Sequence, residues 1–238
     1  MRGFNLVIIL KLFLLILVVY ILLLLPAAAA FKYGILPFFY KGFGFFLLGL
    51  VLSLADFWLL LLSAVIIPGL GWQVLRLGYS GFHRLHFSEK NVRNWLFSLV
   101  LYLPAAVILD FFHLYPLKTL HLRLFGAKVG KDVVMGGLVL DPCLLEVGDN
   151  TIIGGFSTIA GHAVERGNIS FRKVRIGRNC GVGIRAVILP GACLEDGSML
   201  GAQSLLPKMS LIPAHQTYGG VPARNLDSSR QRDLGQEL

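Results

Sequence analysis

The side chain best suited to acid–base chemistry in this chain is His162, in the stretch Ala160-Gly161-His162-Ala163. A neutral imidazole takes up a proton near neutral pH, because its ordinary pKa lies close to 6.5. Only His162 stands where a regular pattern stops and an irregular stretch begins. The other five histidines lie in the apolar N-terminal half or in the C-terminal tail: His83, His86, His113, His121 and His215. We interpret His162 as a candidate general base, and a surface histidine without a role is the alternative.

A six-residue period surrounds this histidine. An aliphatic residue recurs with a small residue four places later, as in Ile153 with Ser157 and Ile188 with Ala192. The pattern holds in two blocks, Val129–Val164 and Ile176–Leu211, each two coils long. Such a short fixed period predicts a hexapeptide parallel β-helix, in which three units close one triangular coil. We expect the residues between the blocks, from Glu165 to Arg175, to leave this prism as a loop; a loop-rich β domain is the alternative fold.

Each position of the repeat has a predicted task. The aliphatic residue fills the axis of the prism, and the small residue lies near a corner, where a larger side chain would collide with its neighbours. Met135 and Asp141 stand in the aliphatic position of the first coils. Glycine often follows the aliphatic residue, and we expect it to supply backbone freedom at the corner. These glycines are Gly148, Gly154, Gly177, Gly183 and Gly201.

The N-terminal half is too apolar for an ordinary soluble domain, and 55% of all 238 residues are hydrophobic. Leu6–Leu25 and Phe43–Pro68 each reach the length that crosses about 30 Å of hydrocarbon as a helix. Trp95–Phe112, interrupted by Pro104, is marginal in length and is predicted to be a shallow helix, with a third span as the alternative. Alternatively, Leu6–Leu25 belongs to a signal peptide. We expect Asp56 and Asp110, within the apolar runs, to be paired, with Lys11 a candidate partner.

The basic residues favour two full spans with the repeat region in the cytoplasm, so the chain is predicted to be an integral inner or plasma membrane protein. The aromatic and basic stretch Gly71–Asn94 indicates an interfacial segment, and the net charge of +9 suits anionic lipid. No nucleic-acid motif accompanies that charge, so nucleic acid is not an expected partner. Three cysteines indicate no disulfide framework. The predicted organisation is a membrane domain at 1–120, a β-helix at 121–226 and a tail at 227–238.

From Phe125 to Leu226 the chain resembles the hexapeptide-repeat acyltransferases, whose fold is a left-handed parallel β-helix. The coils, the single histidine before an extruded loop and the ending Tyr218-Gly219-Gly220-Val221-Pro222-Ala223-Arg224 carry this resemblance. Asp141-Pro142 followed by Glu146-Val147-Gly148-Asp149-Asn150 resembles a lead-in found in several members. Gly161-His162 with Glu165 and Gly167, fused to membrane helices, is similar to the C-terminal membrane regions of peptide synthetases that make poly-amino acids.

The resemblance implies a homotrimer with each active site between two neighbouring prisms. It also implies transfer of an acyl group, most often acetyl, from a CoA thioester to a hydroxyl or amine. His162 would deprotonate the acceptor, and backbone N–H groups at a glycine corner would stabilise the oxyanion. Glu165 and Asp141 are the nearest carboxylates that could orient the imidazole. Asp141 would otherwise cap the first coil, and Glu165 would otherwise be a solvated loop charge.

For the CoA itself, Lys208 and Arg224 are candidate partners of its phosphates. Small residues would let a pantetheine arm lie along the prism, although the fold requires small residues there in any case. These positions are Gly183, Ala186, Gly201 and Ala202.

Other functions on this scaffold fit less well. A zinc carbonic anhydrase needs three converging histidines, so no metal is predicted. A nucleotidyltransferase needs a glycine-rich nucleotide-binding domain, which is missing here. Amide-bond formation from a carrier-bound aminoacyl thioester stays open, as does a non-catalytic trimeric membrane scaffold. An enzyme tied to the bilayer is expected to act on a membrane-associated acceptor.

Overall fold

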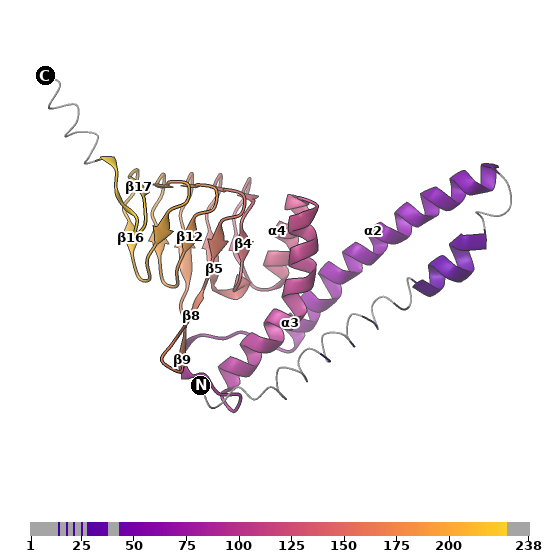
Figure 1. The fold of residues 1–238 in the computed structure, drawn as a ribbon, viewed down its shortest axis with the longest axis horizontal. Coiled ribbons are helices and arrows are strands. Elements are labelled where there is room, and N and C mark those ends of the chain that lie inside the picture. Colours follow the sequence, from indigo (N-terminus) through magenta and orange to yellow (C-terminus); the bar gives the residue numbers. More distant parts are fainter. Residues whose placement is uncertain are drawn as a thin grey trace, which may run out of the picture.

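The computed structural model describes residues 28–37 and 43–227, together with Leu14, Val18, Ile21 and Leu25. Most of the predicted first span, Leu6–Leu25, and the last eleven residues therefore lie outside the described residues. Helices come first in the chain and short strands follow, and the two parts lie side by side (Figure 1). The helical segments of the first part are η1 (Ala30–Ile35), α2 (Phe43–Val74), α3 (Lys90–Phe111) and α4 (Tyr115–Leu124), and the short strand β1 (Gly81–Arg84) lies between α2 and α3. A 3₁₀ turn, η3 (Pro142–Leu144), lies in the second part.

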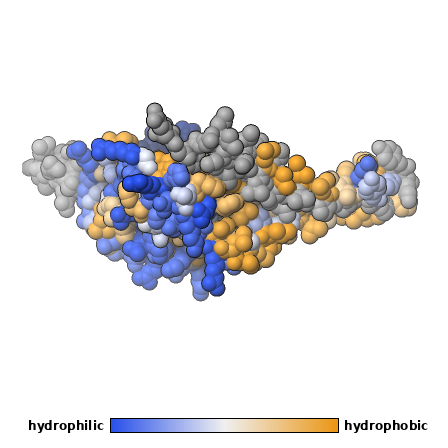
Figure 2. Space-filling view, turned by 90° about the horizontal axis from the view of Figure 1, so that it is seen from below, coloured by the Kyte–Doolittle hydropathy of each residue, from blue (hydrophilic) through white to orange (hydrophobic). Residues whose placement is uncertain are grey.

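Helices α2 and α3 are both long and apolar enough to cross a membrane. Their surroundings differ, because 11% of the most apolar window of α2 is buried in the protein, against 44% for α3. The first half of α2 extends away from the β-helix and lies beside η1, whereas α3 packs against α2 and α4 (Figure 1). Hydrophobic residues gather over the helices and hydrophilic residues over the strands (Figure 2). The sequence predicted that Trp95–Phe112 forms a shallow helix in the membrane, whereas in the structure the corresponding helix α3 packs against α2 and α4.

Helix α4 carries two buried polar residues, of which Lys118 joins the helices to the β-helix and His121 joins α4 to α2 and α3. Lys118 is 1% exposed, contacts the Asp110 carboxylate and donates to the carbonyl of Gly137 at 2.6 Å. Asp110 is thus paired, with Lys118, while the candidate partner Lys11 lies outside the described residues. His121 is fully buried, its ring stacks on Tyr102 and burial lowers its pKa. The predicted domain boundary at 120/121 falls inside α4, so this helix belongs to the junction between the two parts.

The C-terminal part is a parallel β-helix with three sheets, as the six-residue period predicted. The first sheet contains β2 (Lys128–Val129), β5 (Leu145–Val147), β10 (Val174–Ile176), β13 (Cys193–Leu194) and β16 (Leu211–Ile212). The second contains β3 (Val134–Met135), β6 (Ile152–Ile153), β11 (Gly181–Val182), β14 (Met199–Leu200), β17 (Thr217–Gly219) and the antiparallel β18 (Arg224–Asn225). The third contains β4 (Leu138–Val139), β7 (Thr158–Ile159), β12 (Val187–Ile188) and β15 (Leu205–Leu206).

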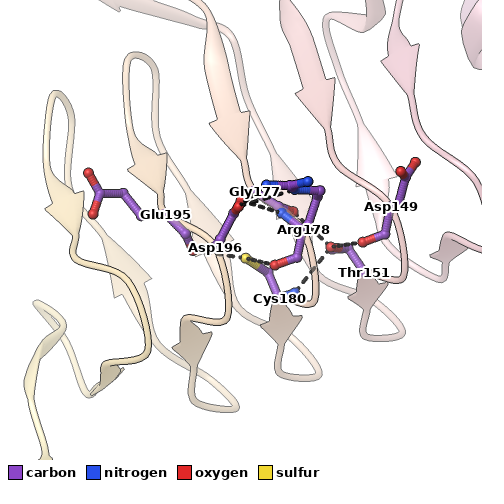
Figure 3. Close-up of polar contacts among 7 residues, drawn as sticks. All are labelled: Asp149, Thr151, Gly177, Arg178, Cys180, Glu195 and Asp196. Carbon is purple, nitrogen blue, oxygen red and sulfur yellow. Dashed lines mark hydrogen bonds and ion pairs between the residues drawn. The ribbon is translucent and has the colours of Figure 1, made fainter.

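The aliphatic position of the repeat builds the core. Ile153, Val182 and Leu200 lie in register in neighbouring strands, and each is at most 3% exposed. Met135, which departs from the aliphatic pattern, is fully buried and belongs to the same core. The small residues stack at the corners. Thr151 Oγ1 donates to the carbonyl of Gly177 at 2.8 Å and accepts from the N–H of Cys180 at 3.1 Å (Figure 3).

The repeat glycines have a different role from the one we expected. None of the five has a positive φ; the left-handed corner residues come two places later, at Asn150, Phe156, Asn179, Arg185 and Gln203. At Gly148, Gly154, Gly177 and Gly183 the close approach of the next coil excludes a side chain, whereas a Cβ on Gly201 would meet no atom closer than 3.3 Å. A Cβ on Gly154 would lie 2.7 Å from the carbonyl oxygen of Val182 and from the backbone nitrogen of Ile184. Glycine is thus required for coil stacking rather than for conformational freedom.

The interruption between the two blocks is an ordered hairpin, not the predicted loop from Glu165 to Arg175. Strands β8 (His162–Glu165) and β9 (Asn168–Phe171) pair with each other, and β9 also pairs with β1 (Gly81–Arg84). The coil resumes at β10, whose Ile176 pairs with Val147 of the preceding coil. Strand pairing satisfies the backbone polar groups that a loop would leave to water. The stretch Gly71–Asn94, predicted to lie among lipid headgroups, contributes β1 to this sheet.

Candidate active site

A buried carboxylate orients the imidazole of His162. The side chain of Asp141 follows β4 at a corner of the first coil and is fully buried. Its Oδ2 lies 2.6 Å from Nδ1 of His162 and accepts from the backbone N–H of Gly161 at 2.8 Å. A buried charge requires such partners, because its desolvation is otherwise too costly. Since a carboxylate only accepts, the ring proton belongs on Nδ1 and Nε2 is left as an acceptor.

The second carboxylate oxygen of Asp141 is bound from the helical half of the chain. Tyr79, between α2 and β1, donates its hydroxyl to Oδ1 at 3.0 Å and is 5% exposed. Burial, reinforced by the charge of Asp141, raises the pKa of Tyr79 well above its usual value. The neighbouring Cys143 is partly buried, and this desolvation raises the pKa of its thiol to about 11. Both neighbours of the carboxylate therefore stay protonated and uncharged near neutral pH.

Aromatic rings pack around the imidazole. The ring centroid of Trp95, near the start of α3, lies 4.8 Å from that of His162 and 6.0 Å from that of Phe171 in β9. The His162 side chain keeps 18% of its surface exposed. Within the described residues, Nε2 of His162 has no hydrogen-bond partner. The imidazole is thus fixed at one nitrogen and available at the other, as a general base requires.

Sequence reasoning missed Tyr79 and Trp95 as parts of this site. Both precede His162 by more than sixty positions, and both were assigned to membrane-associated segments. The aromatic content of Gly71–Asn94 was the one signal, and it supported a lipid-facing interpretation equally well. Their contacts depend on the β1–β9 pairing, which no local sequence pattern indicates.

The structure does not bring Glu165 to His162. Both residues lie on β8, three positions apart, and successive side chains of a strand point to opposite faces. Glu165 instead contacts the ammonium group of Lys208, a residue proposed for CoA phosphates. Between the two carboxylates that the sequence left open, the geometry therefore favours Asp141.

The other residues proposed to contact CoA are distributed over the β-helix, which forms a three-sided rod. Gly183 and Ala202 face each other between neighbouring coils at a corner that joins the second and third sheets, and Gly201 precedes Ala202 there. Arg224 is exposed in β18 at the C-terminal end of the rod. Ala186 is fully buried in the core, so it cannot line a surface groove as proposed. Its methyl group fills the prism because the small position of the repeat points inward.

An open groove of about 620 Å³ lies on the first sheet, away from the Asp141–His162 pair, which we call the dyad. Glu146 lines it and is bound by Lys173 at 2.7 Å and by Lys128 at 3.2 Å. The hydrogen bond from Lys173 is the main reason why the pKa of Glu146 falls to about 2. These ion pairs join β2, β5 and the segment before β10 across the sheet.

The fold and the dyad define a hexapeptide-repeat protein with a carboxylate-oriented histidine beside its rod. No family model matches the chain. The putative colanic acid biosynthesis acetyltransferase WcaF of Escherichia coli (strain K12) is 30% identical over 136 residues, covering 46% of this chain and 74% of that relative. The chain therefore belongs to the hexapeptide-repeat acetyltransferases, in agreement with the resemblance seen in its motifs.

Two further relatives are matched over smaller parts of their length. Galactoside O-acetyltransferase of Escherichia coli (strain K12) is 31% identical over 102 residues, covering 40% of this chain and 49% of that protein. Delta-poly-L-ornithine synthetase of Acinetobacter baumannii (strain AB307-0294) is 29% identical over 109 residues, covering 45% of this chain and 8% of that protein. This chain thus spans about half of the first of these and a small part of the second.

Solved structures resemble the chain at a lower level. A hexapeptide-repeat acetyltransferase of Vibrio cholerae O1 biovar eltor complexed with acetyl coenzyme A has a TM-score of 0.45 and 14% identity, covering 59% of this chain and 90% of that one. A maltose O-acetyltransferase of Clostridium difficile 630 has a TM-score of 0.40 and 22% identity, covering 54% and 86% of the two chains. At these TM-scores the likeness supports no inference about function.

Proposed function

We propose that this protein transfers an acetyl group from acetyl-CoA to a hydroxyl or amine of a membrane-associated acceptor, with His162 as the general base. The observation that supports this most directly is the Asp141–His162 pair, in which Nδ1 is held and Nε2 has no hydrogen-bond partner in the described part of the chain. Family membership supports the acetyl donor, since the related WcaF and galactoside enzymes are named acetyltransferases.

The proposed reaction needs no covalent enzyme intermediate. Nε2 takes the proton of the acceptor O–H or N–H as its oxygen or nitrogen attacks the thioester carbonyl carbon. The tetrahedral intermediate collapses, the C–S bond breaks, and the imidazolium returns the proton to the CoA thiolate. Asp141 stabilises the imidazolium through the Nδ1–H bond. General-base help of this kind typically contributes about 10²–10⁴-fold in rate.

A membrane location is proposed from the shape of α2. Its N-terminal half exposes a long series of apolar side chains, including Leu47, Val51, Leu54 and Leu59 at 48–67% exposure. Seventeen helical residues, 44–60, rise roughly 25 Å, close to the thickness of a bilayer's hydrocarbon core. An exposed apolar surface of that length is costly in water. We infer that α2 anchors the enzyme and that the docked α3 does not cross.

The proposed assembly is a homotrimer of left-handed β-helices with the repeat domain in the cytoplasm. One prism would contribute the corner with His162, and its neighbour would contribute the corner with Gly183, Gly201 and Ala202. Lys208 remains a candidate for CoA phosphates only if Glu165 releases it, whereas Arg224 is exposed. The separation of these residues on one rod supports a site shared between subunits.

Mass spectrometry of lipids and glycans from cells that express the wild type or His162→Ala tests the proposal. We expect a species heavier by one acetyl group in the wild type alone. An identical profile for both proteins, each confirmed to be folded, would favour the non-catalytic scaffold instead.

The likeness to the poly-ornithine synthetase supports a second candidate, amide-bond formation from a carrier-bound aminoacyl thioester. A pantetheine arm carries either donor, so the dyad alone does not separate them. Purified protein given acetyl-CoA or an aminoacyl-loaded carrier protein distinguishes the two: product from the carrier alone would overturn the acetyl donor.

A further inference from the structure

The helical half of the chain contributes directly to the Asp141–His162 pair through one hydroxyl group. Asp141 has two carboxylate oxygens with different tasks. Oδ2 faces Nδ1 of His162 and the N–H of Gly161, while Oδ1 accepts from the hydroxyl of Tyr79 at 3.0 Å. Tyr79 is 5% exposed and Asp141 is 1% exposed, so water does not replace that donor readily.

Tyr79 is itself held in place by contacts on several sides. Its ring centroid lies 4.8 Å from that of Phe171, in the strand that pairs with the one carrying His162. It belongs to a buried cluster with Val92, Trp95 and Leu96 of α3. The segment that follows it becomes β1, the outer strand of the hairpin sheet. The hydroxyl therefore reaches Asp141 only when α3 and β1 are docked on the hairpin.

We propose that Tyr79 is a positioning residue for catalysis, which acts through Asp141 and makes the dyad dependent on the docked helical half. The hydroxyl bond fixes the carboxylate plane, so that Oδ2 points along the Nδ1–H bond. This inference rests on the proposed function, because the dyad must first be catalytic. Hydrogen bonds to a charged group are strong, and the loss of one leaves a buried acceptor unsatisfied.

The test compares Tyr79→Phe with Tyr102→Phe in the full-length protein. Tyr102 is 1% exposed and its hydroxyl has no hydrogen-bond partner among the described residues, so its replacement removes the same atom without removing a hydrogen bond to Asp141 or His162. Transfer from radiolabelled acetyl-CoA into a total membrane lipid and glycan extract gives the rate. We expect Tyr79→Phe to lower kcat roughly 10- to 100-fold with the KM for acetyl-CoA unchanged, and Tyr102→Phe to match the wild type.

A double-mutant cycle separates positioning from general support of the fold. If Tyr79 acts only through Asp141, then Asp141→Asn and Asp141→Asn/Tyr79→Phe have the same kcat. Additive losses would contradict the proposal. The downfield resonance of the His162 Nδ1 proton provides a readout without turnover: it should move upfield in Tyr79→Phe and stay in place in Tyr102→Phe.

The outcomes distinguish the two levels of inference. If His162→Ala transfers as fast as the wild type, the proposed function fails. If His162→Ala is inactive while Tyr79→Phe keeps wild-type kcat and an unshifted Nδ1 proton, the positioning role fails and the function stands.

Discussion

At the scale of single residues, the site depends on which carboxylate reaches the imidazole. Asp141 is buried against Nδ1 of His162, whereas Glu165 lies on the other face of β8 and contacts Lys208. The sequence left both carboxylates open, although Glu165 lies only three positions from His162. The distinction arises because strand geometry separates neighbours in sequence, while coil closure brings Asp141 and Gly161 together across a corner.

Isosteric replacement of each carboxylate tests this assignment. We expect Asp141→Asn to lower kcat by roughly 10²-fold or more, because the amide no longer stabilises an imidazolium. Glu165→Gln should change kcat less than about threefold, since an exposed ion pair contributes at most about 1 kcal/mol. Steady-state transfer rates for the two purified variants show which carboxylate orients His162. A larger loss of kcat in Glu165→Gln than in Asp141→Asn would assign that role to Glu165.

Much of the rod could be predicted from the sequence, and much of the site could not. The period of Ile153, Val182 and Leu200 is a local pattern with one structural solution, so core, coil boundaries and the position of His162 followed from it. Tyr79 and Trp95 flank β1, which pairs with a strand more than eighty residues further along the chain. A single sequence carries no signal for such a pairing, and aromatic residues beside apolar runs suit a lipid interface equally well.

At the scale of the elements, glycine limits how closely the coils stack. A Cβ at Gly154 would collide with backbone atoms of the next coil, whereas one at Gly155 meets nothing within 4 Å. We expect Gly154→Ala to lower the free energy of unfolding by about 1–3 kcal/mol, because backbone atoms cannot move aside. Gly155→Ala should change it by less than about 0.5 kcal/mol. Urea unfolding of both variants measures this, and equal midpoints would contradict the stacking role.

The ion pairs of Glu146 connect neighbouring strands of the first sheet and should make stability depend on pH. Lys173, with Lys128, lowers the pKa of this carboxylate to about 2 in the folded protein. The stabilisation is therefore complete above the unfolded value near 4.5 and is lost as the pH falls toward 2. We expect Glu146→Gln to remove part of the stability difference between pH 6 and pH 3, while the effect on activity at neutral pH stays small. Thermal unfolding midpoints at the two pH values give the comparison; an unchanged difference would show that the pairs do not form.

At the scale of the whole molecule, the exposed apolar half of α2 is the feature on which the proposed membrane anchor depends. Leu54 is 59% exposed in the middle of this surface, and Val74 is 80% exposed at the end of the helix. An arginine at the centre of a spanning helix costs about 2.5–3.5 kcal/mol, whereas one at its end reaches the headgroups. Leu54→Arg should reduce the membrane-bound fraction after alkaline extraction, and Val74→Arg should not. Equal extraction of both variants would argue against the anchor.

The hairpin leaves the rod and returns without disturbing it, since Val174–Ile176 pairs with Leu145–Val147 as if the two coils were consecutive. The ladder therefore does not depend on how long the excursion is or what it contains. The tip of the hairpin between Glu165 and Asn168 can therefore change in length without altering the ladder, whereas exchange of the whole segment would also remove His162 and Phe171. The tip is thus the place where a new loop could be grafted onto the scaffold.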